Sequence, residues 1–350
     1  MMNEKTIPTA LVPEREDLDA LIAEFEVNDT MEPRATLADL MNGLDSENDV
    51  RKKVPSKRAL DELMDMEGLD EVKTALQRQL SYAKIMKIRQ ELGFRAPRRI
   101  MHFIFTGNPG VGKTTVARLI GEIFHQAGLL STGHTVETNR AGLVGRYIGE
   151  SEANTTAKIA EARGGVLFID EIYALTSEVS GAAEETRDFG IKVLDTLMPV
   201  LSDPESDLIV VGAGYLDNMR RFLKANPGLA SRFPIVLDFE DFTTEQIWSI
   251  ARKRLEEFDF TVSEDGEEAV RRLIDEAKGI KDFGNGRFAV TLVEDHVIPT
   301  LCERIEKAWQ TGVMSAARMR QLSVVESADI PSIETLFPLT GKKRAALGFR

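Results

Sequence analysis

The sequence contains one cysteine, Cys302, among its 350 residues. A single cysteine excludes an intramolecular disulfide and a cysteine-rich metal site. Its place in a helical pattern predicts a small buried hydrophobic side chain rather than a nucleophile. No apolar run reaches the roughly eighteen residues that a membrane span requires, and no signal-peptide pattern follows the N-terminus. These absences predict a cytoplasmic protein in a reducing compartment.

Positive charge is also scarce, since the net charge is -13. Residues 1–50 hold thirteen Asp and Glu but only three Lys and Arg, which leaves -3 for the other 300 residues. An acidic balance disfavours non-specific binding to nucleic acid. The acidity therefore belongs to an N-terminal extension, residues 1–60. It is expected to be partly disordered or helical, because Leu18, Leu21, Ile22 and Phe25 recur at helical spacing.

Four nearly continuous apolar runs and one weaker run predict the strands of a parallel sheet, because strands covered on both faces do not alternate with polar residues. They lie at 101–105, 135–138, 165–169, 207–212 and 234–239. Helical patterns fall between them, from Leu69 to about Leu92 and from Thr114 to Gln126. This order predicts right-handed βαβ units in an α/β domain over residues 61–240.

The strand patterns stop after Phe242. Three helices are predicted over Thr243–Glu257, Glu264–Lys278 and Asn285–Trp309, which make a small all-helical domain over residues 241–315. Residues 316–350 have mixed polarity and a basic end, so we interpret them as a C-terminal tail of uncertain order.

A glycine-rich loop joins the first strand to its helix. Residues Gly107 to Thr114 read G-N-P-G-V-G-K-T and match G-x-x-x-x-G-K-[ST], the Walker A or P-loop pattern. Its glycines let backbone amides surround phosphates, and the helix N-terminus adds partial positive charge. Lys113 is expected to reach the terminal phosphates, and the Thr114 hydroxyl to coordinate Mg²⁺. The expected nucleotide-binding residues are Asn108, Pro109, Gly110, Val111, Gly112, Lys113, Thr114 and Thr115.

The strand at 165–169 ends in two acids, Asp170 and Glu171. In a P-loop protein this pattern is a Walker B motif, in which Asp170 holds the Mg²⁺ shell and Glu171 acts as general base toward water. A strand that merely ends in a charged loop would look the same in isolation. Because no Asn-Lys-x-Asp guanine-reading motif occurs, the predicted substrate is ATP rather than GTP.

Six motifs together resemble one group of AAA+ ATPases, which contains the red-type Rubisco activases (CbbX) and the stage V sporulation protein K relatives. The resemblance covers residues 68–309. The segments that carry it are 106–114, 143–149, 164–171, 213–215, 226–233 and 284–287.

The resemblance implies an ATP-binding, chaperone-like hydrolase that forms a homo-oligomeric ring, usually a hexamer, and remodels a client protein. It implies that Arg232 is an arginine finger that reaches the neighbouring site and that Arg287 is the sensor 2 arginine. Tyr147 and Ile148 match a central-pore loop that grips polypeptide. Ala213-Gly214-Tyr215 stands, as it does in this group, where many other AAA+ proteins carry a polar sensor 1 asparagine, and Tyr215 is the candidate for that role.

The residues leave the client open. Rubisco, a sporulation component and a secretion component are alternatives, and any small-molecule activator is unknown. A nucleic-acid motor is disfavoured by the acidic balance. A scaffold that binds ATP without turnover is disfavoured because Lys113, Glu171 and Arg232 are all present.

Overall fold

The computed structural model describes residues 59–96, 99–176, 184–225, 227–280, 283–310 and 315–337, all within one compact unit, Lys57–Arg350. The predicted helix around Leu18–Phe25 and the basic end after Pro338 lie outside the described residues. None of the described helices combines the length and the apolar character that crossing a lipid bilayer requires.

A parallel five-stranded sheet forms the centre of the larger domain, in the order β2-β3-β4-β1-β5. Phe103 on β1 is paired with Val211 on one side and Ile235 on the other. All five predicted strands are confirmed. Their bounds are β1 Phe103–Gly107, β2 Thr135–Thr138, β3 Val166–Ile169, β4 Ile209–Gly214 and β5 Ile235–Phe239.

Alternate residues of the strands enter two different cores. Phe103 and Phe105 pack with the helices on one face, whereas Ile104 packs with those on the other. Burial on both faces explains why β1, β3 and β4 read as unbroken apolar runs. The outermost strand β5 has one open face, since Val236 is 55% exposed.

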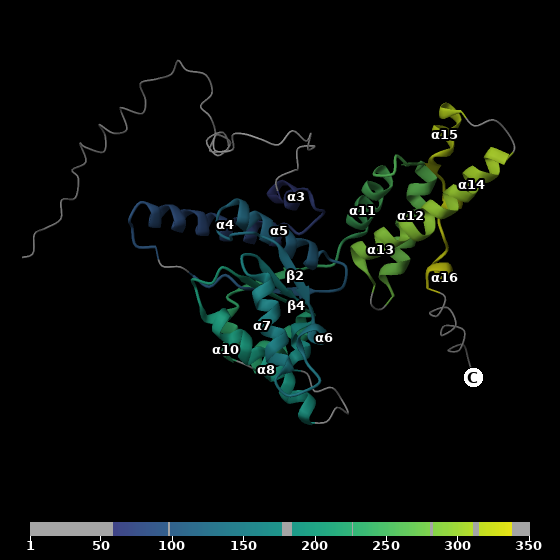
Figure 1. Cartoon of the computed structure of the whole chain (residues 1–350). Helices are drawn as coiled ribbons and strands as arrows, with labels where there is room; N and C mark the ends of the chain where they lie inside the picture. Colours follow the sequence, from purple (N-terminus) through teal and green to yellow (C-terminus); the bar gives the residue numbers. More distant parts are fainter. Residues whose placement is uncertain are drawn as a thin grey trace, which may run out of the picture. The chain divides into compact units, whose positions relative to one another are not determined.

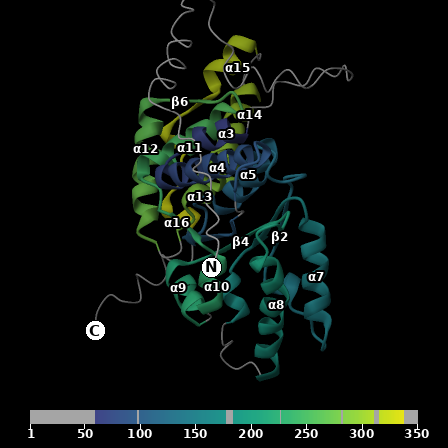
Figure 2. The ribbon, with the colours of Figure 1, turned by 90° about the vertical axis from the view of Figure 1, so that its left-hand side faces the viewer.

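Helices cover both faces of the sheet (Figure 1). One face carries α3 Ala59–Asp65, α4 Asp70–Glu91 and α5 Lys113–Gln126. The other carries α6 Arg140–Leu143, α7 Glu150–Ala162, η2 Ile172–Leu175, α8 Glu184–Ser202, α9 Leu216–Ala225 and α10 Pro227–Arg232. In Figures 1 and 2, α7 and α8 run side by side. This doubly covered sheet is the predicted α/β architecture.

The smaller domain is helical and has its own apolar core. It consists of α11 Thr244–Glu256, α12 Glu264–Lys278, α13 Asn285–Thr291, the π-helical segment η3 Leu292–Val297 and α14 Ile298–Gln310. Thr243 caps α11 reciprocally with Gln246. The run expected as one helix from Asn285 is thus interrupted by a π segment. Cys302 on α14 is exposed, so the predicted burial of this side chain is wrong.

Residues 316–337 contain short elements that pack on the helical domain rather than a featureless tail. They are α15 Ala316–Leu322, β7 Val324–Val325, η4 Ser327–Asp329 and α16 Ile333–Leu336. The strand β7 pairs in parallel with β6 Thr261–Val262, so the smaller domain is not entirely helical. Val325 is fully buried in its core.

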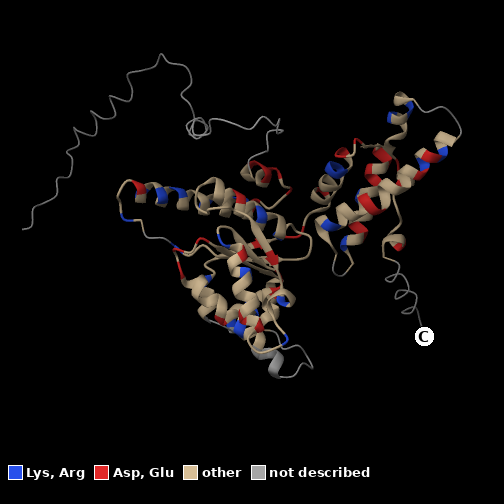
Figure 3. Cartoon of the chain, viewed as in Figure 1, with Lys and Arg blue, Asp and Glu red and all other residues tan. Residues whose placement is uncertain are grey.

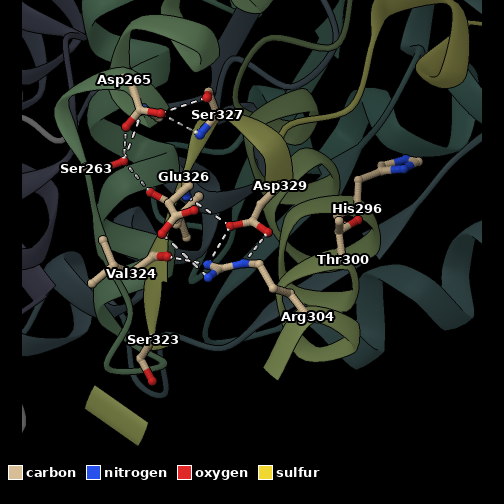
Figure 4. A network of polar contacts seen from close by, with 12 residues as sticks. Ser263, Asp265, His296, Thr300, Arg304, Ser323, Val324, Glu326, Ser327 and Asp329 are labelled. Carbon is tan, nitrogen blue, oxygen red and sulfur yellow. Dashed lines mark hydrogen bonds and ion pairs between the residues drawn. The ribbon is translucent and has the colours of Figure 1, made fainter. Parts of the chain in front are cut away.

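A buried ion pair fixes this segment (Figure 4). The Arg304 guanidinium on α14 donates to both carboxylate oxygens of Asp329, at 2.9 and 2.8 Å, and to the Val324 carbonyl oxygen at 2.6 Å. Asp329 is only 2% exposed, so loss of Arg304 would leave a buried charge without its partner. Because each element spans only a few residues, no sequence periodicity indicated them.

Candidate nucleotide-binding site

The loop between β1 and α5 requires its glycines. Gly107, Gly110 and Gly112 all have positive φ, at 147°, 75° and 91°. A Cβ atom on Gly107 would lie 2.5 Å from the Phe239 carbonyl oxygen, and one on Gly110 would collide with that of Gly284. Gly112 caps α5 without a side-chain hydrogen bond. The helix therefore presents uncapped backbone amides and the positive end of its dipole, a binding site suited to phosphate.

Lys113 lies over this loop at the start of α5. Its ammonium donates to the carbonyl oxygens of Gly107 and Asn108, at 2.8 and 2.7 Å. Burial lowers the pKa of Lys113 below its ordinary value, while the negative charge of Asp170 acts in the opposite direction. The cation is thus held between the loop and the Walker B strand, where phosphates would lie.

The acids after β3 emerge from a strand whose four residues are all buried. The Asp170 amide donates to the Thr138 carbonyl oxygen at 2.8 Å, and the Asp170 carboxylate accepts from the Glu171 amide at 3.1 Å. Glu171 has a positive φ of 49°, which is uncommon for a residue with a side chain and concentrates at functional sites. Both carboxylates project from the carboxyl edge of the sheet beside the P-loop.

Tyr173 lies next to Glu171 and was missed by the sequence analysis. Burial raises the pKa of Tyr173 to about 12, and the charge of Glu171 contributes in the same direction. Its ring lies 6.4 Å from that of Tyr215, between centroids. The two rings therefore lie beside the Walker B carboxylates. Only Tyr215 was predicted, because it belongs to the 213–215 motif.

A cleft of about 980 Å³ brings the predicted groups together. Residues of both domains line it. The predicted ones are Pro109, Gly110, Gly112, Lys113, Thr114, Thr115, Asp170, Glu171, Tyr215 and Arg287. Two predicted residues face elsewhere: Val111 is fully buried in the core, and the Asn108 amide donates to Asp241. Thr114 and Asp170 supply the hydroxyl and carboxylate oxygens that suit a Mg²⁺ ion shared with phosphates.

The cleft lining also includes apolar side chains, namely those of Met66, Phe242, Ile250 and Val290. This composition suits a purine base. Beside it, Glu67 accepts hydrogen bonds from Lys253 at 2.6 Å and Ser249 at 2.8 Å. Burial alone would raise the pKa of Glu67, but these hydrogen bonds lower it overall. No motif predicted Glu67 or Lys253, because the two lie 186 residues apart.

Three further predicted residues lie outside the cleft. Arg232 ends α10, where its guanidinium donates to Ser202 Oγ at 2.7 Å and to the Gly228 carbonyl oxygen at 2.8 Å. Tyr147 and Ile148 stand between α6 and α7 and are 72% and 94% exposed. The structure therefore separates the predicted residues into a cleft group and a surface group.

These features define a P-loop nucleoside triphosphatase with a lid. They are the parallel sheet, the P-loop, the Walker B acids at the sheet edge and the helical domain that also lines the cleft. Comparison with known proteins narrows this class. Residues 103–241 match the model of the ATPase family associated with various cellular activities (AAA), and residues 243–335 match that of the AAA lid domain.

Two curated relatives and one solved structure illustrate the similarity. Stage V sporulation protein K of Bacillus subtilis is 37% identical over 67% of this chain and 72% of its own length. A chloroplastic ribulose bisphosphate carboxylase/oxygenase activase of Cyanidioschyzon merolae is 31% identical over 78% and 87%. The FIGL-1 AAA domain in complex with ADP superposes with a TM-score of 0.52 at 19% identity, over 82% and 90%, and shows the fold alone.

The chain belongs to the AAA ATPases, and its chemistry is ATP hydrolysis. Its helical domain is the AAA lid. The lid model reaches residue 335, which agrees with the packing of Val325 in the lid core.

Proposed function

We propose that this ATPase assembles as a homo-oligomeric ring, a hexamer, and uses hydrolysis to remodel a client protein. The observation that carries the proposal is the division of the predicted residues. One protomer's cleft contains every expected catalytic group except Arg232, which lies half-buried at the end of α10, outside the cleft lining. A second protomer is the natural place for that arginine to act.

Within the cleft, each group has a role that follows from its place. Lys113 compensates the charge of the β- and γ-phosphates. Thr114 and Asp170 hold Mg²⁺, which neutralises phosphate charge when bound. Glu171 accepts the proton of the attacking water. Arg287 contacts phosphate from the lid, and Tyr215 is the sensor 1 candidate at the edge of β4.

Arg232 has a geometry suited to action between protomers. Its hydrogen bonds to Ser202 and Gly228 stay within its own domain and hold the guanidinium at the end of α10. Among the residues that the structure describes, Arg232 makes no ion pair with a carboxylate, so its charge is left available to an anion. A γ-phosphate of the adjacent protomer would supply one.

The exposed pair Tyr147 and Ile148 fits the substrate-gripping role. Two large side chains that are mostly in solvent have an energetic cost without a binding partner. An aromatic and an aliphatic group can hold many polypeptide sequences through apolar contact. The Glu150 carboxylate accepts from the Tyr147 amide at 3.1 Å and from the Arg146 amide at 2.7 Å, which fixes the base of the loop.

The client is a protein rather than nucleic acid in this proposal. Lys and Arg alternate with Asp and Glu along the helices of both domains (Figure 3), and the net charge is -13. The named relatives act in sporulation and on ribulose bisphosphate carboxylase/oxygenase, so a component of either kind is a candidate client. The cytoplasmic location stays a prediction.

The test is affinity capture with Glu171→Gln in Mg-ATP, because a ring that binds ATP without hydrolysing it retains its client. A Glu171→Gln, Tyr147→Ala double variant is the matched control, since it traps nucleotide but lacks the aromatic grip. We expect a specific protein to be retained by the first and released by the second. Retention of DNA or RNA in place of protein, indifferent to Tyr147, would contradict the proposal.

A further inference from the structure

The P-loop and the lid are in direct contact, and the contact includes polar side chains to which the motifs assign no role between the two domains. The Gly286 amide at the start of α13 donates to the Gly110 carbonyl oxygen at 3.0 Å. Gly110 has no space for a side chain, because a Cβ atom would collide with the Gly284 carbonyl oxygen. Gly110 of the P-loop therefore packs directly against the first turn of α13 in the lid.

Asp241 connects the same two parts from the linker between β5 and α11. Its carboxylate accepts from the Asn108 side-chain amide at 3.0 and 2.9 Å. It also accepts from the Asn285 side-chain amide at 2.9 Å. One carboxylate thus joins a P-loop residue to the first residue of α13.

Asn285 is held in an unusual conformation at this junction. It has a φ of 47° and is only 2% exposed. Its side-chain oxygen accepts from the Phe242 amide at 3.1 Å, and its amide also donates to the Pro109 carbonyl oxygen at 3.3 Å. Asparagine is one of few residues that tolerate a left-handed backbone, but its buried amide is fully used here. The side chain contacts the linker, the P-loop and the acid between them.

We propose that Asp241 and Asn285 are positioning residues that couple the P-loop to the lid. Phosphates bind the loop backbone that Asn285 and Gly286 contact, so a shift of the loop between nucleotide states moves the start of α13. The linker between β5 and α11 moves with α13, because the Asn285 side chain accepts a hydrogen bond from the Phe242 amide. This route acts through loop backbone and is distinct from the contact of Arg287 with phosphate. It rests on ATP hydrolysis by this family and not on the client.

The alternative is that the network only stabilises the folded chain. Buried, satisfied polar groups commonly have that effect. The two possibilities differ in what nucleotide does to the lid. A coupling element changes the lid response and turnover, whereas a purely structural one changes stability alone.

The test uses Asn285→Gly in the full chain. Glycine adopts a φ of 47° without strain, so the variant removes the amide and preserves the backbone. Asp259→Gly is the matched control, because Asp259 is an exposed lid residue with a φ of 59° away from the cleft. If Asn285→Gly does not fold, Asp241→Ala removes the exposed partner instead.

Lid position can be followed from the single natural cysteine. Cys302 is exposed on α14, and a second label at Glu122→Cys on α5 reports on the large domain. Labelled chains are diluted into an excess of unlabelled Cys302→Ser chains, so that only distances within one chain are measured. Distances are compared in ADP and in a slowly hydrolysed ATP analogue, with Mg²⁺.

We expect the difference between the two nucleotide states to shrink by at least about half in Asn285→Gly. We also expect kcat to fall about tenfold, a size typical of coupling between sites, while the ATP dissociation constant changes less than about threefold. Asp259→Gly should match the unaltered chain in all three. A full nucleotide response of the lid in Asn285→Gly, or equal losses in Asp259→Gly, would overturn the proposal.

A swap of the two side chains tests whether the pair itself matters. Asn285→Asp alone places two carboxylates side by side, and Asp241→Asn alone removes the shared acceptor charge. The double variant restores one amide and one carboxylate in exchanged positions, so the lid response should recover above both single variants. Absence of any recovery would show that the pair does not carry the coupling.

Discussion

The cleft and the outer surface of this ATPase are built in different ways. In the cleft, a buried strand and a glycine-rich loop position Lys113 and Asp170 by backbone contacts within one chain. Outside the cleft, half-buried Arg232 ends the short helix α10, and Tyr147 stands in an exposed loop. Under the proposed function, the first group binds nucleotide within a single chain, whereas the second acts only on another molecule.

Arg232→Ala is expected to cause the largest loss of ATP turnover among these variants. We expect ATP turnover to fall about 10³-fold, because arginine fingers in related chemistry contribute that much or more. Arg232→Lys should recover little, since lysine lacks the planar fork. The measurement is steady-state ATPase activity at saturating ATP, with Arg221→Ala as the control from neighbouring helix α9. Activity within threefold of the unaltered chain would place Arg232 outside the reaction.

Glu171→Gln tests the cleft group in the same assay. Loss of the general base should lower kcat by about 10²–10³-fold, while the ATP dissociation constant stays similar because Lys113 and the loop are unchanged. Nucleotide binding measured by calorimetry separates the two quantities. If affinity is lost together with turnover, Glu171 supports the loop and is not the base.

Buried His102 gives a prediction about the stability of the large domain, which supports both the cleft residues and the residues outside the cleft. It is 3% exposed on the sheet and accepts from the Val210 amide at 3.0 Å. Burial lowers the pKa of His102 to about 4, against a smaller opposing effect of the Val200 backbone. In the unfolded chain the His102 imidazole is protonated below about pH 6.5, whereas in the folded chain it stays neutral down to about pH 4. The contribution of neutral His102 to the free energy of unfolding is therefore fully present above pH 6.5 and is lost as the pH falls toward 4. The expected loss is about 2 kcal/mol at pH 5.

Urea unfolding of the unaltered chain and of His102→Asn, compared between pH 7.5 and pH 5, isolates this contribution. The carboxylates titrate in both chains, so only the difference in pH dependence reports on the histidine. Equal pH dependence in the two chains would mean that His102 is protonated in the folded state.

Tyr147→Ala should give the smallest change and the most selective one. We expect basal ATP turnover to remain within about twofold, because the loop lies outside the cleft. Turnover stimulated by the captured client should fall about tenfold, as expected for loss of one aromatic contact, and Tyr147→Phe should retain it. A loss of basal turnover would instead connect this loop to hydrolysis.

The sequence predicts the frame well because each strand and helix carries its own pattern. The helix expected over Glu264–Lys278 has those bounds in the structure, and α4 ends at Glu91, one residue before the expected Leu92. Walker motifs likewise indicated Lys113 and Asp170, since phosphate and Mg²⁺ binding each constrain a short run of adjacent residues, one after β1 and one at the end of β3.

The contacts between domains could not be predicted in that way. Asp241 and Asn285 are 44 residues apart. Asn285 lies in the 284–287 motif, but nothing in that motif indicates a contact with Asp241 or with the P-loop. The same holds for Arg304 and Asp329, whose ion pair orders a segment that lacks any periodicity of its own. Long-range polar pairs leave no local signal, so they appear only once the fold is known.

The most direct test of a site shared between protomers is a mixture of two inactive chains. Lys113→Ala lacks the phosphate-binding cation but keeps Arg232, whereas Arg232→Ala keeps the cleft. In a ring, some interfaces then combine an intact cleft with an intact arginine, so the mixture should regain ATP turnover, up to about a quarter of the unaltered level at equal amounts by random pairing. A mixture that is no more active than its two components would contradict the account.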